Sequence, residues 1–289
     1  MKILLIYRKP IPSQLSIEHL FDGLFYKAKY KDVELSKYTL SGYSKFFSDI
    51  YKIRKFNPDV YHITGGCNHI AVLLPPSKTL ITVHDIGHYL YGLEGVKRII
   101  YKIFFCSIPF LVVRKISVIS ENTKTDLITH FKFCENKIKL IPNSYNKIFN
   151  LPTKHFNLKK PKILQVGTKP YKNVDRLIKS IKGLDVILVL IGKLSVEQLD
   201  LLKMNSIEFE NYYNIELIKL AELYKSADIC TFISIGEGFG VPIIEAQASG
   251  TPLITSNISP MSDVAGLGAV KVNPFDLSDI RNGIVNLIE

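Results

Sequence analysis

The chain has 289 residues, of which 47% are hydrophobic and 22% are charged, and its formal net charge is +11. This composition excludes a disordered or fibrous protein, and the length is sufficient for two domains of ordinary size. The first ten residues, MKILLIYRKP, end in charges and proline rather than forming a signal peptide, and no run of about twenty uncharged apolar residues follows. We therefore expect a cytoplasmic protein without a membrane span.

Apolar runs of strand length alternate with helical patterns through the first half of the chain. The predicted strands are Lys2–Tyr7, Val60–Ile63, Thr79–Val83, Ile116–Ile119 and Ile138–Ile141. The predicted helices are Ser16–Ala28, Ser44–Lys55, Gly95–Val112 and Glu121–Phe131. Because such alternation is typical of a parallel, doubly wound sheet, we expect this half to form one.

A second series of strands and helices follows a polar, lysine-rich stretch, Phe149–Pro161, which we interpret as a linker. The predicted elements are strand Lys162–Val166, helix Asn173–Ile181, strand Val186–Ile191, helix Ile215–Ser226, strand Asp228–Ser234 and strand Pro252–Ser256. We therefore expect two Rossmann-like α/β domains, residues 1–150 and residues 151–289.

The most informative motif is SIGEGFGVPIIEAQASGTPLITS, residues 234–256, in which seven residues separate Glu237 from Glu245. It joins a predicted strand to a short helix, with Pro242 at the start of the helix and Gly250 at its end. We expect the loop between them at the carboxyl edge of the sheet, where ligands bind, and helix N-termini favour phosphate. Two carboxylates repel phosphate but accept hydrogen bonds from sugar or ribose hydroxyls.

This motif resembles the E-x7-E signature of retaining GT-B glycosyltransferases, in particular glycosyltransferase family 4. The resemblance implies two Rossmann-like, doubly wound parallel-sheet domains that face a central cleft, with the acceptor on the N-terminal side and the nucleotide-sugar donor on the C-terminal side. It implies that Glu245 holds the nucleotide ribose and that Glu237 lies beside the donor sugar. The residues between them would meet sugar and phosphate: Gly238, Phe239, Gly240 and Val241. The alternative is a helix N-terminus that merely tolerates acidic residues.

Residues 166–177, VGTKPYKNVDRL, place a glycine turn and two lysines between a predicted strand and a predicted helix. This arrangement is typical of phosphate binding. It resembles the segment of the same family that binds the donor diphosphate, which implies that role for Gly167 and Lys172, with Lys169 as a second cation. Tyr171 stands where the family usually has arginine, which is a departure from the pattern. The alternative is two solvated loop lysines.

Residues 82–87, TVHDIG, resemble the His-Asp pair that closes a strand in the N-terminal domain of the family. The resemblance implies that His84 faces the sugar or phosphates of the donor, where an imidazole can stabilise a leaving diphosphate by hydrogen bonding. The alternative is a structural histidine at a strand end. The candidate catalytic residues are therefore Glu237, His84 and Lys172. No D-x-D motif occurs, so we expect no metal ion and no cofactor.

Basic charge is concentrated in the first half, because residues 1–150 carry 22 Lys and Arg against 11 Asp and Glu, whereas residues 151–289 carry 15 of each. Such a field attracts anionic partners, and basic residues flank the apolar run Ile99–Val113. One hypothesis is that this domain rests peripherally on the inner face of an anionic membrane. The alternatives are a buried core helix with lysines at its ends, or a lysine-rich composition without function.

The resemblance predicts a retaining, metal-independent glycosyltransferase. Its donor would be GDP-mannose or a UDP-hexose, and its acceptor a glycan or lipid-linked hydroxyl in surface polysaccharide biosynthesis, with no nucleic acid as a partner. The alternatives are a sugar-nucleotide epimerase of GT-B architecture and an inactive sugar-nucleotide-binding protein. Family members usually continue past the position of Glu289, so the chain is either a short member or a truncated one.

Overall fold

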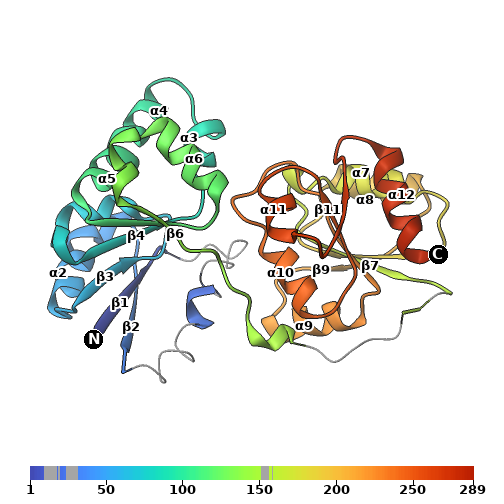
Figure 1. The fold of residues 1–289 in the computed structure, drawn as a ribbon, viewed down its shortest axis with the longest axis horizontal. Coiled ribbons are helices and arrows are strands. Elements are labelled where there is room, and N and C mark those ends of the chain that lie inside the picture. The colour runs from blue at the N-terminus through green and yellow to red at the C-terminus, as the bar shows by residue number, and fades with distance from the viewer. Residues whose placement is uncertain (10–17, 19, 24–31, 151–155, 158) are drawn as a thin grey trace. The chain divides into compact units, whose positions relative to one another are not determined.

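The fold consists of two compact units, Met1–Asn143 and Ser144–Glu289, each built on a parallel sheet (Figure 1). This computed structural model describes residues 1–9, 18, 20–23, 32–150, 156–157 and 159–289. The predicted helix Ser16–Ala28 falls largely outside the described residues. The other predicted strands and helices of both halves are present, and their ends match the prediction or are shifted by at most two residues, apart from the helix Gly95–Val112.

The sheet of the first unit has six strands in the described residues, in the order β2-β1-β3-β4-β5-β6. The strands are β1 (Lys2–Tyr7), β2 (Glu34–Thr39), β3 (Val60–Ile63), β4 (Thr79–Val83), β5 (Lys115–Val118) and β6 (Ile138–Leu140). All neighbouring strands are parallel, as predicted. Strand β2 was not predicted. It lies at an edge of the sheet and is only partly buried, so its residues, ELSKYT, are mostly polar.

The sheet of the second unit, again counted in the described residues, has six parallel strands in the order β12-β11-β10-β7-β8-β9. The strands are β7 (Lys162–Val166), β8 (Ile187–Ile191), β9 (Glu208–Tyr212), β10 (Ile229–Phe232), β11 (Leu253–Ser256) and β12 (Val270–Val272). The two strands that were not predicted, β9 and β12, form the edges. The strand order reverses between β7 and β10, and ligands of such sheets bind outside the carboxyl ends of the strands at the point of reversal.

Helices cover the sheet of the second unit on both faces. They are α7 (Val174–Ser180), α8 (Val196–Met204), α9 (Leu217–Ser226), α10 (Val241–Ala248), α11 (Met261–Ala265) and α12 (Leu277–Ile288). Neighbouring residues of β7 point to opposite faces, because Ile163 belongs to a core with α7 and α12, whereas Leu164 belongs to a second core with α9 and α10. Burial on both faces fixes the register of β7 and therefore the place where the loop after it begins.

The helices of the first unit are shorter. They are α2 (Phe46–Lys55), α3 (Gly87–Tyr91), α4 (Gly95–Tyr101), α5 (Ile108–Val112) and α6 (Glu121–His130). The predicted helix Gly95–Val112 is present but is not uniform, because a π-helical segment, η4 (Lys102–Ser107), joins α4 to α5. Ser120 caps α6 by accepting a hydrogen bond from the Thr123 N–H at 3.1 Å.

The chain passes from one unit to the other before the predicted linker. The 3₁₀ helix η6 (Lys147–Phe149) belongs to the second unit, because the fully buried ring of Phe149 packs edge-on against Tyr224 of α9 at 5.3 Å. An aromatic contact of this kind fixes the segment to its unit. The boundary between the units therefore falls at Asn143, seven residues before the predicted end of the first domain.

Candidate functional site

The loop that follows β7 turns at Gly167 and continues through a short 3₁₀ helix, η7 (Pro170–Lys172). Gly167 has a φ of +92°, and its N–H donates a 2.7 Å hydrogen bond to the carbonyl of Ile191 at the end of β8. A Cβ atom at Gly167 would lie 2.9 Å from Cε of Lys172, so the stem of Lys172 crosses directly over the glycine. Only glycine combines this backbone conformation with room for the lysine.

Asn173 fastens this loop to the rest of the unit. Its backbone is left-handed, with a φ of 62°, and its side-chain amide donates hydrogen bonds to the carbonyls of Ile233 at 3.1 Å and Pro274 at 2.7 Å. The carbonyl of Tyr171 also accepts a 2.8 Å hydrogen bond from the N–H of Ile235. These bonds hold the loop after β7 against the loop after β10, and asparagine tolerates the left-handed conformation better than most residues.

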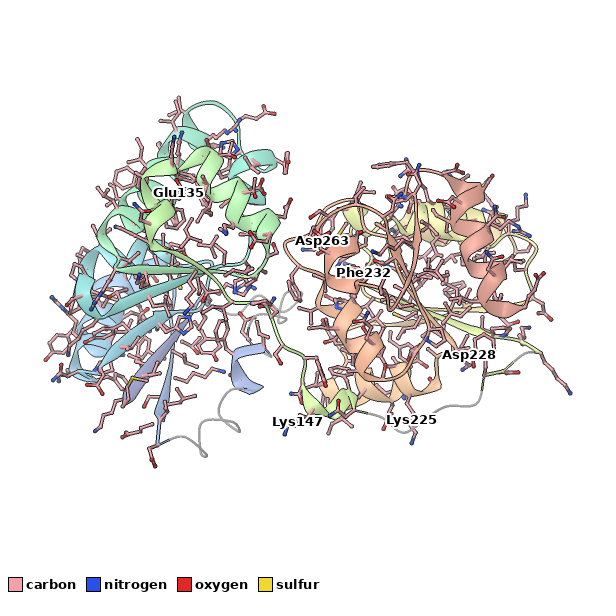
Figure 2. The ribbon with its side chains drawn as sticks, viewed as in Figure 1. Glu135, Lys147, Lys225, Asp228, Phe232 and Asp263 are labelled. Carbon is pink, nitrogen blue, oxygen red and sulfur yellow. The ribbon has the colours of Figure 1, made fainter. Side chains whose placement is uncertain are left out.

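The two predicted motifs meet at Lys172 and Glu237. Nζ of Lys172 lies 2.6 Å from Oε1 of Glu237, and the two side chains are only 13% and 14% exposed. The same ammonium lies 4.4 Å from the ring centre of Phe232, which Figure 2 labels inside the second unit. A partly buried ammonium between a carboxylate and an aromatic face is attracted by both. The lysine is therefore held in place at the carboxyl edge of the sheet.

Helix α10 begins directly after this loop, with Gly240 at its N-cap and Pro242 in its first turn. Gly240 has a φ of +101°, and a Cβ atom there would come within 2.9 Å of Ile243 and 3.1 Å of Phe232. Gly240 has no side chain that could cap the helix, and such a helix start is a partly positive end that favours an anion. Gly238 and Val241 are half-buried there.

Glu245 lies on α10 and is 9% exposed. Its Oε2 accepts a 3.0 Å hydrogen bond from the hydroxyl of Tyr224 on α9. Burial raises the pKa of Glu245 to about 7, although the Tyr224 hydrogen bond and the charge of Lys172 act in the opposite direction. Close to neutral pH the carboxyl group can therefore accept hydrogen bonds from hydroxyls as a carboxylate, or donate one as an acid.

His84 follows β4 in the first unit. Its Nε2 lies 2.7 Å from the carbonyl oxygen of Thr64, and because a carbonyl can only accept, Nε2 carries the proton. Burial lowers the pKa of His84, with the Thr64 hydrogen bond opposing the shift, so the ring is neutral at pH 7. Nδ1 is therefore an acceptor. Gly65 leaves space for the ring, since a Cβ atom there would lie 2.7 Å from Cδ2 of His84.

A second histidine of the first unit, His62, has a structural environment. Its Nε2 lies 2.7 Å from Oγ1 of Thr82, which in turn lies 2.7 Å from Oγ of Ser117. Burial lowers the pKa of His62 to about 4, so it stays neutral well below pH 6. The side chain is a satisfied member of the sheet rather than a candidate for acid–base chemistry.

The structure brings most of the predicted residues of the second unit into one site. Gly167 and Lys172 are in contact, Lys172 is paired with Glu237, and its charge reaches Glu245. Lys169 differs from these residues, because its side chain is exposed at the start of η7. Phe239 is 8% exposed, as expected of a side chain that packs in the core. His84 belongs to the first unit.

Three residues that support this site were not predicted from the sequence. Tyr224 contacts Glu245 from α9, and Gln165 donates to the carbonyl of Gly167 at 3.3 Å while accepting from Thr231 at 3.0 Å. No local signal identifies Tyr224 or Gln165, because their partners Glu245 and Thr231 are distant in the chain. Asn173 could have been found, since asparagine after Lys172 is a signal for a left-handed residue at a helix start.

No group of three or more His, Cys, Asp or Glu side chains among the described residues is arranged to hold a metal ion. None of the helices in the described ranges combines the length and apolarity needed to cross a bilayer.

Both halves of the chain match family profiles. The profile described as "Glycosyl transferases group 1" matches residues 147–289, and the profile "Glycosyltransferase Family 4" matches residues 25–147. The capsular polysaccharide biosynthesis glycosyltransferase CapM of Staphylococcus aureus is 31% identical over 281 residues, which covers 84% of this chain and 72% of CapM. These matches extend over both units rather than over the motifs alone.

The O-antigen chain mannosyltransferase RfbU of Salmonella typhimurium is 30% identical over 229 residues, which covers 76% of this chain. The chain spans 63% of the length of RfbU. Among solved structures, HepE of Anabaena in complex with UDP and glucose superposes with a TM-score of 0.72 at 15% identity, covering 100% of this chain and 90% of HepE. Together with the two six-stranded parallel sheets, this likeness shows the GT-B fold.

Proposed function

We propose that this chain, which belongs to glycosyltransferase family 4 by both halves of its sequence, transfers a hexose from a nucleoside-diphosphate sugar to a hydroxyl group. The observation that carries the proposal is the Lys172–Glu237 pair at the strand-order reversal of the second unit. A cation for a diphosphate and a carboxylate for sugar hydroxyls lie side by side there. That combination matches a sugar nucleotide, which carries both groups.

Each residue of the second unit takes one part of the donor in this proposal. Lys172 and the start of α10 balance the diphosphate charge, while Lys169 adds a screened charge at the surface. Glu245 accepts hydrogen bonds from the ribose hydroxyls. Glu237 and the backbone of Gly238–Gly240 surround the donor sugar.

For His84 the sequence left both the sugar and the phosphates of the donor open as partners, and its hydrogen bonding favours the sugar. Its Nε2–H is already donated to Thr64 and the ring is neutral, so it has no further proton to donate to a leaving diphosphate. Its Nδ1 can accept a hydrogen bond from a sugar hydroxyl. We therefore assign His84 to holding a hydroxyl of the donor sugar from the first unit, and leave the phosphate charge to Lys172.

The proposed reaction retains the configuration at the anomeric carbon and needs no metal ion. The bond from the anomeric carbon to the diphosphate oxygen breaks, the acceptor oxygen bonds to the same face, and the acceptor proton goes to the departing phosphate. The protein contributes position and charge rather than a covalent intermediate. Lys172 supports this scheme, because its ammonium offsets charge that develops on the leaving group.

The names of the relatives support a choice of donor and acceptor. RfbU is named an O-antigen chain mannosyltransferase and CapM a capsular polysaccharide biosynthesis glycosyltransferase. We propose GDP-mannose or a UDP-hexose as donor, bound by the C-terminal domain, and a glycan or lipid-linked hydroxyl of a surface polysaccharide as acceptor, bound by the N-terminal domain. A lipid-linked acceptor would be reached at the cytoplasmic face of a membrane, by a protein bound there peripherally.

Ligand-induced stabilisation tests the donor. The melting temperature is measured with GDP-mannose, UDP-glucose, UDP-galactose and UDP-N-acetylglucosamine. A true donor at about 100 times its Kd should stabilise the protein by roughly 2.7 kcal/mol. If none of these raises the melting temperature, the proposed donor class is wrong.

Product analysis then separates the candidate reactions. Release of nucleoside diphosphate, unchanged by EDTA, together with a product of retained anomeric configuration by NMR, supports the proposal. An epimerase would instead convert one sugar nucleotide to another, and an inactive binding protein would be stabilised without any release. Loss of activity with EDTA that Mg²⁺ restores would contradict metal independence.

A further inference from the structure

One face of the first unit exposes apolar side chains that the fold does not use. Helix α4 buries none of its residues. Along α4, η4 and α5, exposed apolar residues recur every three or four positions. This spacing places them on one face of the helical segment. Its members are each between 41% and 71% exposed: Val96, Ile99, Ile100, Ile103, Phe104 and Leu111. In Figure 1, α4 and α5 follow one another along the upper left of this unit, with α2 below them.

An aromatic groove adjoins this face. It has a volume of about 790 Å³ and runs between α2 and η4, with Phe46 and Phe47 on one side and Phe104 and Phe105 on the other. The ring of His69 lies 5.6 Å from Phe46 and 4.8 Å from Phe105, and it joins the two sides. Phe47 is 80% exposed. The groove and the helix face together form one continuous apolar surface, which we call the apolar face.

The charges around the apolar face are mostly basic, and the acidic neighbour next to α4 is the exposed Glu94 at its N-cap. Residues 95–120 contain five Lys and Arg and no Asp or Glu. Lys45 and Lys52 line the groove. Asp49, the only acidic residue of α2, is buried and accepts hydrogen bonds from Tyr38 and Ser41, so it does not offset the surface charge.

We propose that the apolar face docks on an anionic phospholipid membrane and that the aromatic groove takes up one acyl chain. An exposed apolar surface of this extent marks an interaction site. Interfaces between proteins are depleted of lysine, whereas helices that lie in the plane of a membrane combine an apolar side with Lys and Arg beside it. The lysines around the apolar face therefore favour anionic lipid over a protein partner.

The proposal rests on the proposed function only for the presence of a membrane. The docking itself needs neither donor nor acceptor, so it is measured on the whole chain without either. Failure of docking would therefore leave the transferase proposal intact, and an absence of transfer activity would leave the docking result intact.

Sedimentation with vesicles of phosphatidylcholine and phosphatidylglycerol tests the docking. Binding should appear at about 30 mol% phosphatidylglycerol, be absent on pure phosphatidylcholine, and weaken as salt is raised, because each basic residue contributes roughly fivefold to partitioning. The double variant Ile99→Asp with Ile103→Asp should lose at least about tenfold in partitioning. Ile218→Asp, an equally exposed apolar residue (62%) of the second unit, is the matched control and should change it less than about twofold.

Fluorescence tests the groove. The chain contains no tryptophan, so Phe47→Trp introduces a single reporter. On anionic vesicles its emission should shift to the blue and be quenched by lipids brominated on their acyl chains, whereas Leu267→Trp, on a fully exposed site of the second unit, should show neither effect. Circular dichroism of each variant establishes that it is folded.

Three results would overturn the proposal. They are an absence of binding at low salt on anionic vesicles, equal loss for the double variant and its control, and an unquenched tryptophan at position 47 on vesicles to which the protein is bound. Light scattering provides a further check. If the protein self-associates and the double variant is monomeric, the apolar face is an interface between two copies of the chain rather than a membrane surface.

Discussion

Lys172 and Glu237 form an ion pair of 2.6 Å that joins the loop after β7 to the loop after β10. The proposed cation for the diphosphate is therefore paired with the proposed carboxylate for the sugar. A donor must exchange this contact for contacts of its own. Glu237 therefore keeps the lysine in place and also competes with the diphosphate for it.

Glu237→Gln should raise the affinity for a free nucleoside diphosphate by about threefold or more, because Lys172 loses its competing partner and the phosphates lose a repelling carboxylate. Turnover should fall, since the sugar loses its charged acceptor. Calorimetry with GDP and UDP and a transfer assay measure the two effects. Glu210→Gln, which breaks the 2.8 Å pair with Lys162, is the matched control and should change neither. Weaker nucleotide binding by Glu237→Gln would contradict the competition.

Lys172→Met should weaken binding of the nucleoside diphosphate by roughly 1.5–3 kcal/mol and leave the bare nucleoside nearly unaffected, because a charge-assisted contact to phosphate is lost. The difference should shrink as salt is raised. Lys169→Met should have a smaller effect, since that side chain is exposed. Titrations with both ligands at two salt concentrations give the answer. Equal losses for nucleoside and diphosphate would mean that Lys172 shapes the unit rather than binding phosphate.

Gly167→Ala should displace the stem of Lys172 and reduce affinity for the diphosphate at least about tenfold, because the new Cβ would lie 2.9 Å from Cε of the lysine. Gly183→Ala is the control. Gly183 also has a positive φ, +75°, but a Cβ atom there would meet no other atom within 4 Å, so this variant carries a similar backbone strain without the clash. Similar affinities of the two variants would show that the contact between Gly167 and Lys172 does not determine binding.

The raised pKa of Glu245 predicts a pH-dependent stability. Below about pH 4.5 the carboxyl group is protonated in both the folded and the unfolded chain, and the stabilisation from its raised pKa is fully present. It is lost as the pH rises to about 7, by at most about 1.4 kcal/mol per pH unit. The free energy of unfolding of the wild type should therefore fall relative to Glu245→Gln across this window and not above it.

Denaturant titrations of both proteins at a series of pH values measure this difference, in which all other titrating groups cancel. Parallel curves would place the pKa of Glu245 near that of an exposed glutamate. The same variant should bind a bare nucleoside more weakly by roughly 1.5–3 kcal/mol above pH 7, because the charged acceptor of the ribose hydroxyls is gone. The nucleoside avoids the titration of the phosphate groups.

The sequence was sufficient for the regular elements in the interiors of both sheets. Buried strands such as β7 and β10 are short apolar runs between helical patterns, and their alternation implies a parallel sheet. The edge strands β2, β9 and β12 were missed because their residues are partly exposed and lack a continuous apolar run. The π-helical segment between α4 and α5 was also missed, since its apolar pattern is that of an ordinary helix.

The sequence by itself determined which residues could serve a sugar nucleotide, because glycines, lysines and glutamates at strand ends follow from local order along the chain. The tertiary structure decided which of them meet. The contacts of Lys172 with Glu237 and of Tyr224 with Glu245 depend on the strand order, which places β7 beside β10 although a long stretch of chain separates them. Burial likewise set the pKa of Glu245 and the neutral state of His84, because removal from water acts on the charged form and is absent from any local pattern.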